Sequence, residues 1–262
     1  MKIDNLKKLL KEFENDIIFN ADLKKKNWFN IGGKAKVFYK PAELKDLIKF
    51  LKVLDNKEKI YTIGAGSNTL ITDEVFNGVV IKLGKNFNRL SSLTTEIIIS
   101  GAAVTDKKLS EFAADNNLSG FEFLSCIPGT VGGGIKMNAG CFGNEIKDIL
   151  LSVQVIDKIG NVSSIPSNKI NFDYRTNNLS EDLIFLSASF KGKKKVWELI
   201  KESTPSDISF GDACISEKHS NFFINRGNAT FNDMKKLIEY VEQSVFEKTG
   251  IKIEKEIKIL EN

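Results

Sequence analysis

Two glycine-rich stretches have the residue types that could bind a ligand through the backbone. The first is Gly64-Ala65-Gly66-Ser67-Asn68, and the second runs from Ile127 to Gly143 and holds six of the nineteen glycines. Glycine adopts positive φ without strain and lets a ligand approach bare backbone, so such density favours successive amides presented to a ligand. With the hydroxyls of Ser67 and Thr130, these amides suit the oxygens of an extended phosphate ligand. Either stretch alone could equally be a tight turn, whereas the pair favours a phosphate site.

The cysteines and the single histidine argue against several other chemistries. Cys126, Cys141 and Cys214 are odd in number and widely spaced, so we expect reduced thiols instead of a disulfide framework or a paired thiolate site. His219 is the only histidine, which argues against a zinc site of the usual His and Cys type. No Gly-x-Ser-x-Gly pattern occurs, so a Ser-His-Asp hydrolase is not indicated. We expect no metal site.

The charge balance and the hydropathy pattern limit the partners. The chain has 38 basic and 34 acidic residues, and the net charge of +4 is too small to indicate a nucleic-acid partner. No early apolar run resembles a signal peptide, and no apolar stretch reaches membrane-spanning length. We therefore expect a cytoplasmic protein with neither nucleic acid nor membrane as a partner.

The elements that must position the glycine stretches mix helices and strands without a regular βαβ rhythm, which predicts an α+β fold. Strands are expected at residues 37–39, 60–63, 70–71, 79–81, 97–99, 150–157, 162–165, 183–190 and 251–259. Helices are expected at residues 3–14, 41–51, 105–116, 196–202 and 232–249. The first glycine stretch follows a strand but lacks the third glycine and long helix of a Rossmann fingerprint. The best domain boundary is the lysine-rich link at residues 191–195.

Seven motifs then stand in one register along nearly the whole chain. They are Asn30-Ile31-Gly32-Gly33-Lys34-Ala35, Gly64 to Leu70, Ile127 to Gly133, Met137-Asn138-Ala139-Gly140, Tyr174-Arg175, Ser216 to Phe222, and Glu254 to Lys258. In this order the chain resembles the family of UDP-N-acetylenolpyruvoylglucosamine reductases (MurB).

The resemblance implies a two-subdomain FAD-binding region of the vanillyl-alcohol oxidase (PCMH) type at residues 1–192 and a smaller substrate-binding domain at residues 193–262. It implies FAD as cofactor and NADPH as electron donor. We also expect a monomer. In that family NADPH reduces the flavin, which passes hydride to the enolpyruvyl double bond of a UDP-sugar, giving UDP-N-acetylmuramate for peptidoglycan. The cofactor contacts implied by the resemblance are Gly64, Ala65, Gly66, Ser67, Asn68, Gly101, Ala102, Pro128, Gly129, Thr130, Gly132 and Gly133.

The resemblance also assigns catalytic and substrate residues. Arg175 and Glu256 match the arginine and the glutamate that stabilise the enolate-like charge in the family. Tyr174, Lys218 and His219 match substrate contacts. From residue type alone, Arg175 would be a surface ion pair and Glu256 a residue on a solvated strand face, and the resemblance reverses both interpretations.

One family motif is missing. In the family, the serine that donates a proton lies in a Gly-Ser-x-Phe-Lys-Asn-Pro segment. That segment stands between the strand that matches residues 183–190 and the helix that matches residues 196–202. This chain has only Lys-Gly-Lys-Lys-Lys there, so we expect a block of residues that includes the general acid to be absent. Two alternatives to an active reductase stay open: a degenerate FAD-binding protein of this family, and an alcohol or sugar oxidase on the same fold.

Overall fold

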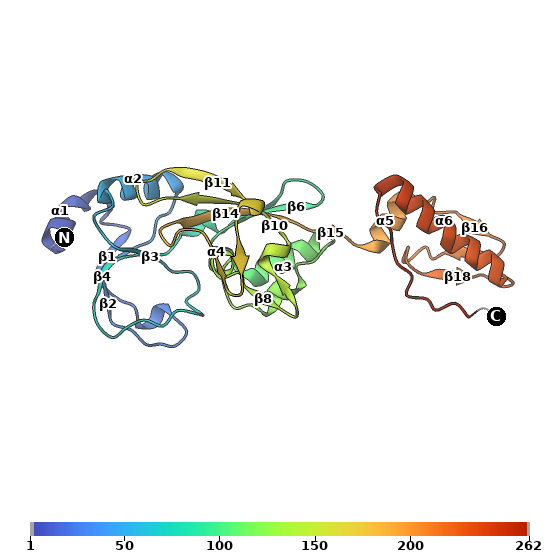
Figure 1. Ribbon diagram of the computed structural model, residues 1–262, viewed down its shortest axis with the longest axis horizontal. Helices are drawn as coiled ribbons and strands as arrows, with labels where there is room; N and C mark the ends of the chain where they lie inside the picture. Colours follow the sequence, from blue (N-terminus) through green and yellow to red (C-terminus); the bar gives the residue numbers. More distant parts are fainter. Residues whose placement is uncertain (1–2, 261–262) are drawn as a thin grey trace. The chain divides into compact units, whose positions relative to one another are not determined.

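The computed structural model describes residues 3–260, which divide into two compact units with the boundary between Lys193 and Lys194 (Figure 1). The sequence places this boundary one residue earlier, after residue 192. Over the described chain, every helix is too short or too polar to cross a bilayer.

The first sheet of the first unit combines one antiparallel and two parallel pairings. Its strands are β1 (Ile17–Asp22), β2 (Lys34–Tyr39), β3 (Ile60–Thr62) and β4 (Phe76–Ile81), in the order β1-β2-β4-β3. Strand β1 is antiparallel to β2, whereas β2 and β3 both run parallel to β4. Helices α1 (Ile3–Leu9) and α2 (Leu44–Leu54) pack on it, and their buried Leu6, Phe50 and Leu54 share one apolar cluster with Val37 and Val79.

Both helices are shorter than expected at one end. The helix expected at 3–14 stops at Leu9, and a single 3-10 turn, Lys11–Phe13, follows. Leu10 between them has φ −101° and ψ 17°, which breaks the α-helix. The helix expected from Pro41 begins at Leu44, because the Pro41 carbonyl accepts a hydrogen bond from the amide of Gly84 at 3.0 Å and joins a loop instead.

The second sheet is fully antiparallel. Its strands are β5 (Leu90–Ser92), β6 (Ile97–Gly101), β10 (Leu150–Ile156), β11 (Val162–Pro166) and β14 (Ile184–Lys191), in the order β11-β10-β14-β6-β5. The hairpin expected around residues 158–161 is confirmed by the pairing of β10 with β11. Helices α3 (Asp106–Asp115) and α4 (Val131–Lys136) contribute Leu109, Val131 and Ile135 to the core beneath this sheet.

Short strands and 3-10 turns complete the first unit. The strands are β7 (Leu118–Ser119), β8 (Gly140–Cys141), β9 (Asn144–Glu145), β12 (Phe172–Asp173), β13 (Thr176–Asn177) and β15 (Lys193–Lys194), the last of which reaches the boundary. The further 3-10 turns are Lys24–Lys26, Lys85–Phe87, Glu122–Cys126, Ile146–Asp148 and Ser167–Lys169. The pairs β8-β9 and β12-β13 are small hairpins that carry site residues.

The second unit packs two helices on a three-stranded antiparallel sheet. Its elements are α5 (Val196–Ser203), β16 (Ser209–Phe210), β17 (Ala213–Ile215), β18 (Phe223–Asn225) and α6 (Phe231–Thr249). The long helix is confirmed with its expected ends: Thr230 and Asp233 form a capping box, and Gly250 takes the left-handed conformation after the last turn. Leu237, Val241 and Val245 of α6 fill the core.

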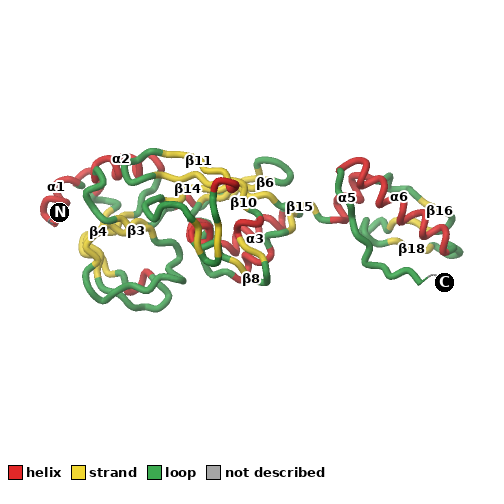
Figure 2. Tube along the Cα trace, in the orientation of Figure 1, coloured by secondary structure: helices red, strands yellow, loops and turns green. Residues whose placement is uncertain are grey.

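Two expected strands are wrong. Residues 251–260 have no regular secondary structure and follow α6 as an extended loop (Figure 2). Alternating isoleucines predict a strand only where a sheet edge is available to pair with it, and here only Ile253 joins the core. Leu70 and Ile71 lie in the long loop between β3 and β4 instead of in a strand, and a Cβ built at Gly32 would lie 2.9 Å from the side chain of Ile71.

Candidate functional site

One cavity of about 770 Å³ in the first unit brings the two glycine stretches together. Of the expected cofactor contacts, it is lined by Gly64, Ala65, Gly66, Ser67, Asn68, Ala102, Pro128, Gly129, Thr130, Gly132 and Gly133. Gly101 is buried beside Ala102 and packs against the carbonyl of Phe87, so the structure places it behind the cavity wall. Arg175 also lines the cavity. The structure therefore brings most of the expected cofactor contacts together on one cavity, and their role as cofactor contacts stays a prediction.

The first glycine stretch follows β3, at the parallel edge of the first sheet, and its backbone amides form no hydrogen bonds within residues 3–260. The amide of Ile63 still donates to the carbonyl of Ile81 at 2.9 Å. Beyond it, the amides of Gly64 to Asn68 donate to no protein acceptor anywhere in residues 3–260. Gly66 has φ +72°, and a Cβ there would lie 2.3 Å from the carbonyl oxygen of Lys26, so only glycine fits. The stretch presents free donors to the cavity.

The second stretch is tied to the end of β6. The amides of Val131 and Gly132 donate to the carbonyls of Val104 and Ala102, both at 2.9 Å. These bonds set the entry to α4 beside the first glycine stretch. A Cβ added to Gly64 would lie 2.3 Å from Oγ1 of Thr130, so the two stretches are in direct contact.

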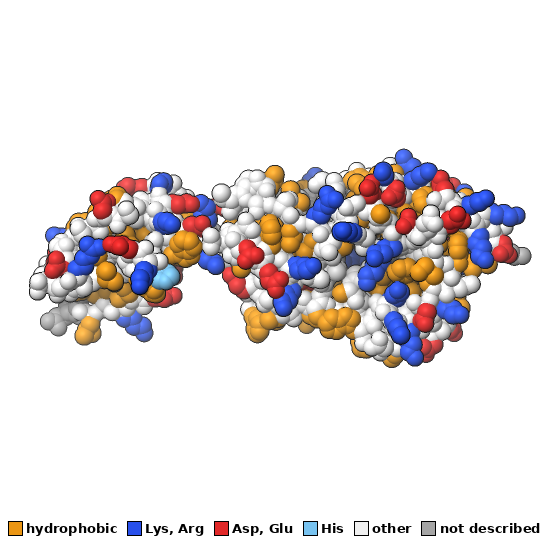
Figure 3. Space-filling view, turned by 180° about the vertical axis from the view of Figure 1, so that it is seen from behind, with side chains coloured by type: hydrophobic (Ala, Val, Ile, Leu, Met, Phe, Trp, Pro, Cys, Tyr) orange, Lys and Arg blue, Asp and Glu red, His pale blue; other side chains and the backbone are white. Residues whose placement is uncertain are grey.

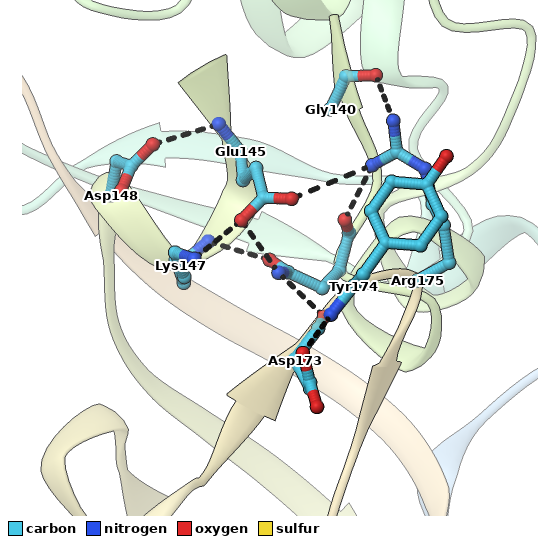
Figure 4. Close-up of polar contacts among 8 residues, drawn as sticks. Gly140, Glu145, Lys147, Asp148, Asp173, Tyr174 and Arg175 are labelled. Carbon is cyan, nitrogen blue, oxygen red and sulfur yellow. Dashed lines mark hydrogen bonds and ion pairs between the residues drawn. The ribbon is translucent and has the colours of Figure 1, made fainter. Parts of the chain in front are cut away.

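Arg175 is held by backbone carbonyls of the segment that follows α4. Its Nη1 donates to the carbonyl of Asn138 and its Nη2 to that of Gly140, both at 3.0 Å (Figure 4). Arg175 itself has φ +55°, an uncommon conformation for a residue other than glycine that tends to occur at functional sites. The two bonds use two of the five guanidinium donors and fix the plane of the group.

Glu145 on β9 completes this arrangement. Its Oε1 lies 3.8 Å from Nη1 of Arg175, and its Oε2 accepts from Nδ2 of the fully buried Asn138 at 3.0 Å. Nζ of Lys147 lies 2.5 Å from the same Oε2. The hydrogen bond from Lys147, and secondarily that from Asn138, holds the pKa of Glu145 below its usual range, despite an opposing effect of desolvation. Glu145 therefore stays ionised beside the arginine.

The remaining expected site residues are exposed. Tyr174 is 77% exposed, and its ring lies 5.1 Å from the guanidinium carbon of Arg175. Lys218, His219 and Glu256 belong to the second unit, and all three are exposed. On the face drawn in Figure 3, the histidine is at the surface and basic and acidic side chains are interspersed. The meeting of these second-unit residues with Arg175 stays a prediction.

Among the charged residues of the cavity wall that the sequence analysis does not assign to the site, Lys82 and Asp106 have shifted pKa values. Lys82 follows β4, and burial, with Lys26 and Lys40 nearby, lowers its pKa. Asp106 is the first residue of α3, and burial raises its pKa to about 7. Neither lies in a motif, so no sequence signal marks them; each reaches the cavity through the packing of distant segments.

Comparison with known proteins decides the family. A profile described as FAD binding domain matches residues 35–165, and one described as UDP-N-acetylenolpyruvoylglucosamine reductase, C-terminal domain, matches residues 138–260. A protein of Pelagibacter ubique named UDP-N-acetylenolpyruvoylglucosamine reductase is 54% identical, over 99% of this chain and 100% of its own length. This chain belongs to the UDP-N-acetylenolpyruvoylglucosamine reductase family. The resemblance found in the seven motifs is thereby confirmed.

Solved structures confirm the fold. The crystal structure of the UDP-N-acetylenolpyruvylglucosamine reductase from Thermus caldophilus has 25% identity and a TM-score of 0.59, covering 87% of this chain and 94% of that chain. An alkyldihydroxyacetonephosphate synthase, at 14% identity, has a TM-score of 0.53 and covers 74% of this chain and 41% of its own. The latter likeness concerns the fold alone. The expected α+β fold with an FAD-binding region of the vanillyl-alcohol oxidase type is correct.

The alignment with the Pelagibacter relative also bears on the missing motif. It spans 301 positions, whereas this chain has 262 residues, so at least 39 positions of the relative have no counterpart here. That number agrees in size with a missing segment of a few tens of residues, such as the serine-bearing one expected between β14 and α5.

Proposed function

We propose that this chain binds FAD in the cavity of its first unit and uses NADPH to reduce UDP-N-acetylglucosamine enolpyruvate to UDP-N-acetylmuramate, a step of peptidoglycan precursor synthesis. The observation that carries the proposal is the convergence of both glycine stretches and Arg175 on one cavity, in a chain 54% identical to a named reductase. We place FAD binding in residues 1–192 and UDP-sugar binding in residues 193–262, and we propose a cytoplasmic monomer.

The cavity residues fit a flavin dinucleotide. A volume of about 770 Å³ lies within the range of roughly 300–1,000 Å³ typical of cofactor sites. The unused amides of Gly64 to Asn68 suit the diphosphate oxygens, because each can donate without a cationic side chain. Lys82, which has no acidic partner in the described part of the chain, adds a positive charge to the same wall. The proposed cofactor contacts are those that line the cavity, with Gly101 supporting them from behind.

Arg175 is the residue best placed for the chemistry. Bound FAD would supply the two-electron reduction of the enolpyruvyl double bond. Reduction at the methylene carbon develops negative charge next to the substrate carboxylate, and a preorganised guanidinium stabilises such charge without reorganising. The carbonyls of Asn138 and Gly140 provide that preorganisation. We assign Glu256 to stabilise the same charge together with Arg175, and we assign Tyr174, Lys218 and His219 as substrate contacts. No residue of this chain is assigned as the proton donor.

The proposal is tested by substrate-dependent NADPH oxidation, with the product identified by mass spectrometry. We expect product from the FAD-loaded chain. Arg175→Lys should lower kcat about 10²-fold to 10³-fold, because lysine keeps the positive charge but lacks the planar guanidinium that donates to two carbonyls at once. Arg89→Lys is the matched control, because Arg89 is exposed and its side chain donates only to Asn86 among residues 3–260. Bound FAD without any product would contradict the reductase and support the degenerate FAD-binding protein.

A further inference from the structure

Asp106 is a carboxyl group that the proposed reaction does not use. Its side chain is completely buried, and neither carboxyl oxygen has a hydrogen-bond partner within residues 3–260. It also belongs to the wall of the cavity. An unpaired carboxylate is costly to bury, so a buried Asp without a partner indicates either a protonated group or a partner supplied by a ligand.

Two glycines of the second stretch make room for this carboxyl. A Cβ built at Gly129 would lie 2.5 Å from Oδ2 of Asp106, and one built at Gly134 would lie 3.2 Å from Oδ1. The Asp106 amide donates to the Gly129 carbonyl at 3.3 Å, which holds the start of α3 against the stretch. The carboxyl is therefore packed directly against the second glycine stretch, which lines the same cavity as the first.

The charged groups around Asp106 do not neutralise it. Lys136 of α4 pairs with Glu181 at 3.1 Å, and Arg175 is engaged by Asn138, Gly140 and Glu145. The other titratable groups on the cavity wall or on the elements packed against α3 are Lys82, Asp182, Tyr61, Cys126, Cys141 and Glu122, and those on α3 itself are Lys107, Lys108, Glu111 and Asp115. None forms an ion pair with Asp106 in the described structure, and burial accordingly raises its pKa to about 7.

We propose that Asp106 is a further residue of the cofactor site, and that binding of a dinucleotide diphosphate in the cavity takes up one proton at its carboxyl. This inference rests on the proposed function. An anion bound in the cavity that Asp106 lines repels the carboxylate and favours the neutral acid. The neutral acid can in addition donate a hydrogen bond, which the carboxylate cannot.

The direction in which pH changes the affinity for FAD follows from the charge of the Asp106 carboxyl. Below about pH 7 the carboxyl is already neutral and binding needs no proton. Above it, each binding event must protonate an ionised group, so the Kd for FAD rises with pH and approaches tenfold per unit for one linked proton. Lys82, whose pKa is lowered by burial, also loses charge as the pH rises and would weaken binding in the same direction, but it is unchanged in an Asp106 variant. The difference between the wild type and Asp106→Asn therefore isolates Asp106.

The test is calorimetric titration of the whole chain with FAD from about pH 6 to 9, in pairs of buffers with different ionisation enthalpies. We expect the wild type to take up close to one proton above pH 7, Asp106→Asn to take up distinctly less and to show a flatter Kd profile, and Asp115→Asn to match the wild type. Asp115 is the matched control because it is exposed at the other end of α3.

The outcomes separate this inference from the proposed function. FAD binding by the wild type without proton uptake, or with equal uptake by Asp106→Asn, would overturn the role of Asp106 and leave the cofactor assignment intact. Failure of the folded wild type to bind FAD would overturn both. If Asp106→Asn does not fold, the proton uptake measured on the wild type in the two buffers still decides whether binding is proton-linked at all.

Discussion

The contact between Gly64 and Thr130 gives a sharp test of how the cavity is closed. A Cβ at residue 64 would lie 2.3 Å from Oγ1 of Thr130, well inside the 3.4 Å at which ordinary contacts begin. Threonine is stiff at χ1, so the hydroxyl does not move aside freely. Gly64→Ala must therefore push the two glycine stretches apart, and overpacking of this kind costs about 1–3 kcal/mol.

A second substitution should relieve the strain. Thr130→Ala removes Oγ1 and leaves the Cβ of residue 130 at 3.5 Å from the new methyl group, an ordinary contact. The double variant is therefore expected to be nearly as stable as Thr130→Ala alone. The coupling energy between the two sites should be about 1–3 kcal/mol, equal to the strain that the single variant carries.

Thermal unfolding of the four cofactor-free proteins measures this coupling. For a unit of 193 residues, about 2–4 °C of Tm corresponds to 1 kcal/mol, so Gly64→Ala should lower the Tm of the first unit by roughly 2–12 °C. FAD titration of the same proteins should show weakened binding for Gly64→Ala, and the double variant should bind as Thr130→Ala does. Additive losses in the double variant would show that the two stretches do not meet as described.

Three further variants test other parts of the account. Because burial raises the pKa of Asp106 to about 7, its carboxyl should lower the free energy of unfolding by up to about 4 kcal/mol as the pH rises from 4 to 7. Asp106→Asn should flatten this loss in urea unfolding, and an unchanged pH profile would contradict the burial. Glu145→Gln should cost less than about 1 kcal/mol of stability, since the pair with Arg175 is partly exposed, yet should lower kcat/KM about tenfold; unaltered kinetics would remove Glu145 from the site. Thr230→Ala should destabilise α6 by about 1 kcal/mol in urea unfolding, and no change would show that the cap is dispensable.

Local patterns predict much of the fold. The ends of α6 follow from Thr230 and Gly250, and the β10-β11 hairpin follows from two apolar runs around a short polar turn. The strand expected at 251–259 fails for a physical reason. Alternation defines a face, but a strand also needs a neighbouring edge, and sequence does not reveal whether one is available. The expected start of α2 is likewise wrong, because the hydrogen bond between Pro41 and Gly84 joins segments far apart in the sequence.

The same contrast between sequence motifs and long-range packing applies to the residues of the site. The glycine stretches are predicted from their local chemistry and Arg175 from its match to a family motif, and the structure gathers them on one cavity. Asp106 and Glu145 are not, since an acidic residue in a first helical turn or on a hairpin is ordinary in sequence. Their significance arises from the segments packed against them: the glycines of the second stretch for Asp106, and Arg175 for Glu145.

The central claim, that the cavity between the glycine stretches binds FAD, is tested most directly by titrating the purified chain with FAD and following flavin fluorescence. We predict saturable binding of one FAD per chain, lost or strongly weakened in Gly66→Ala, where a Cβ would meet the Lys26 carbonyl at 2.3 Å. A folded wild-type chain that leaves the fluorescence of added FAD unchanged, and that retains no FAD on gel filtration, would contradict the claim.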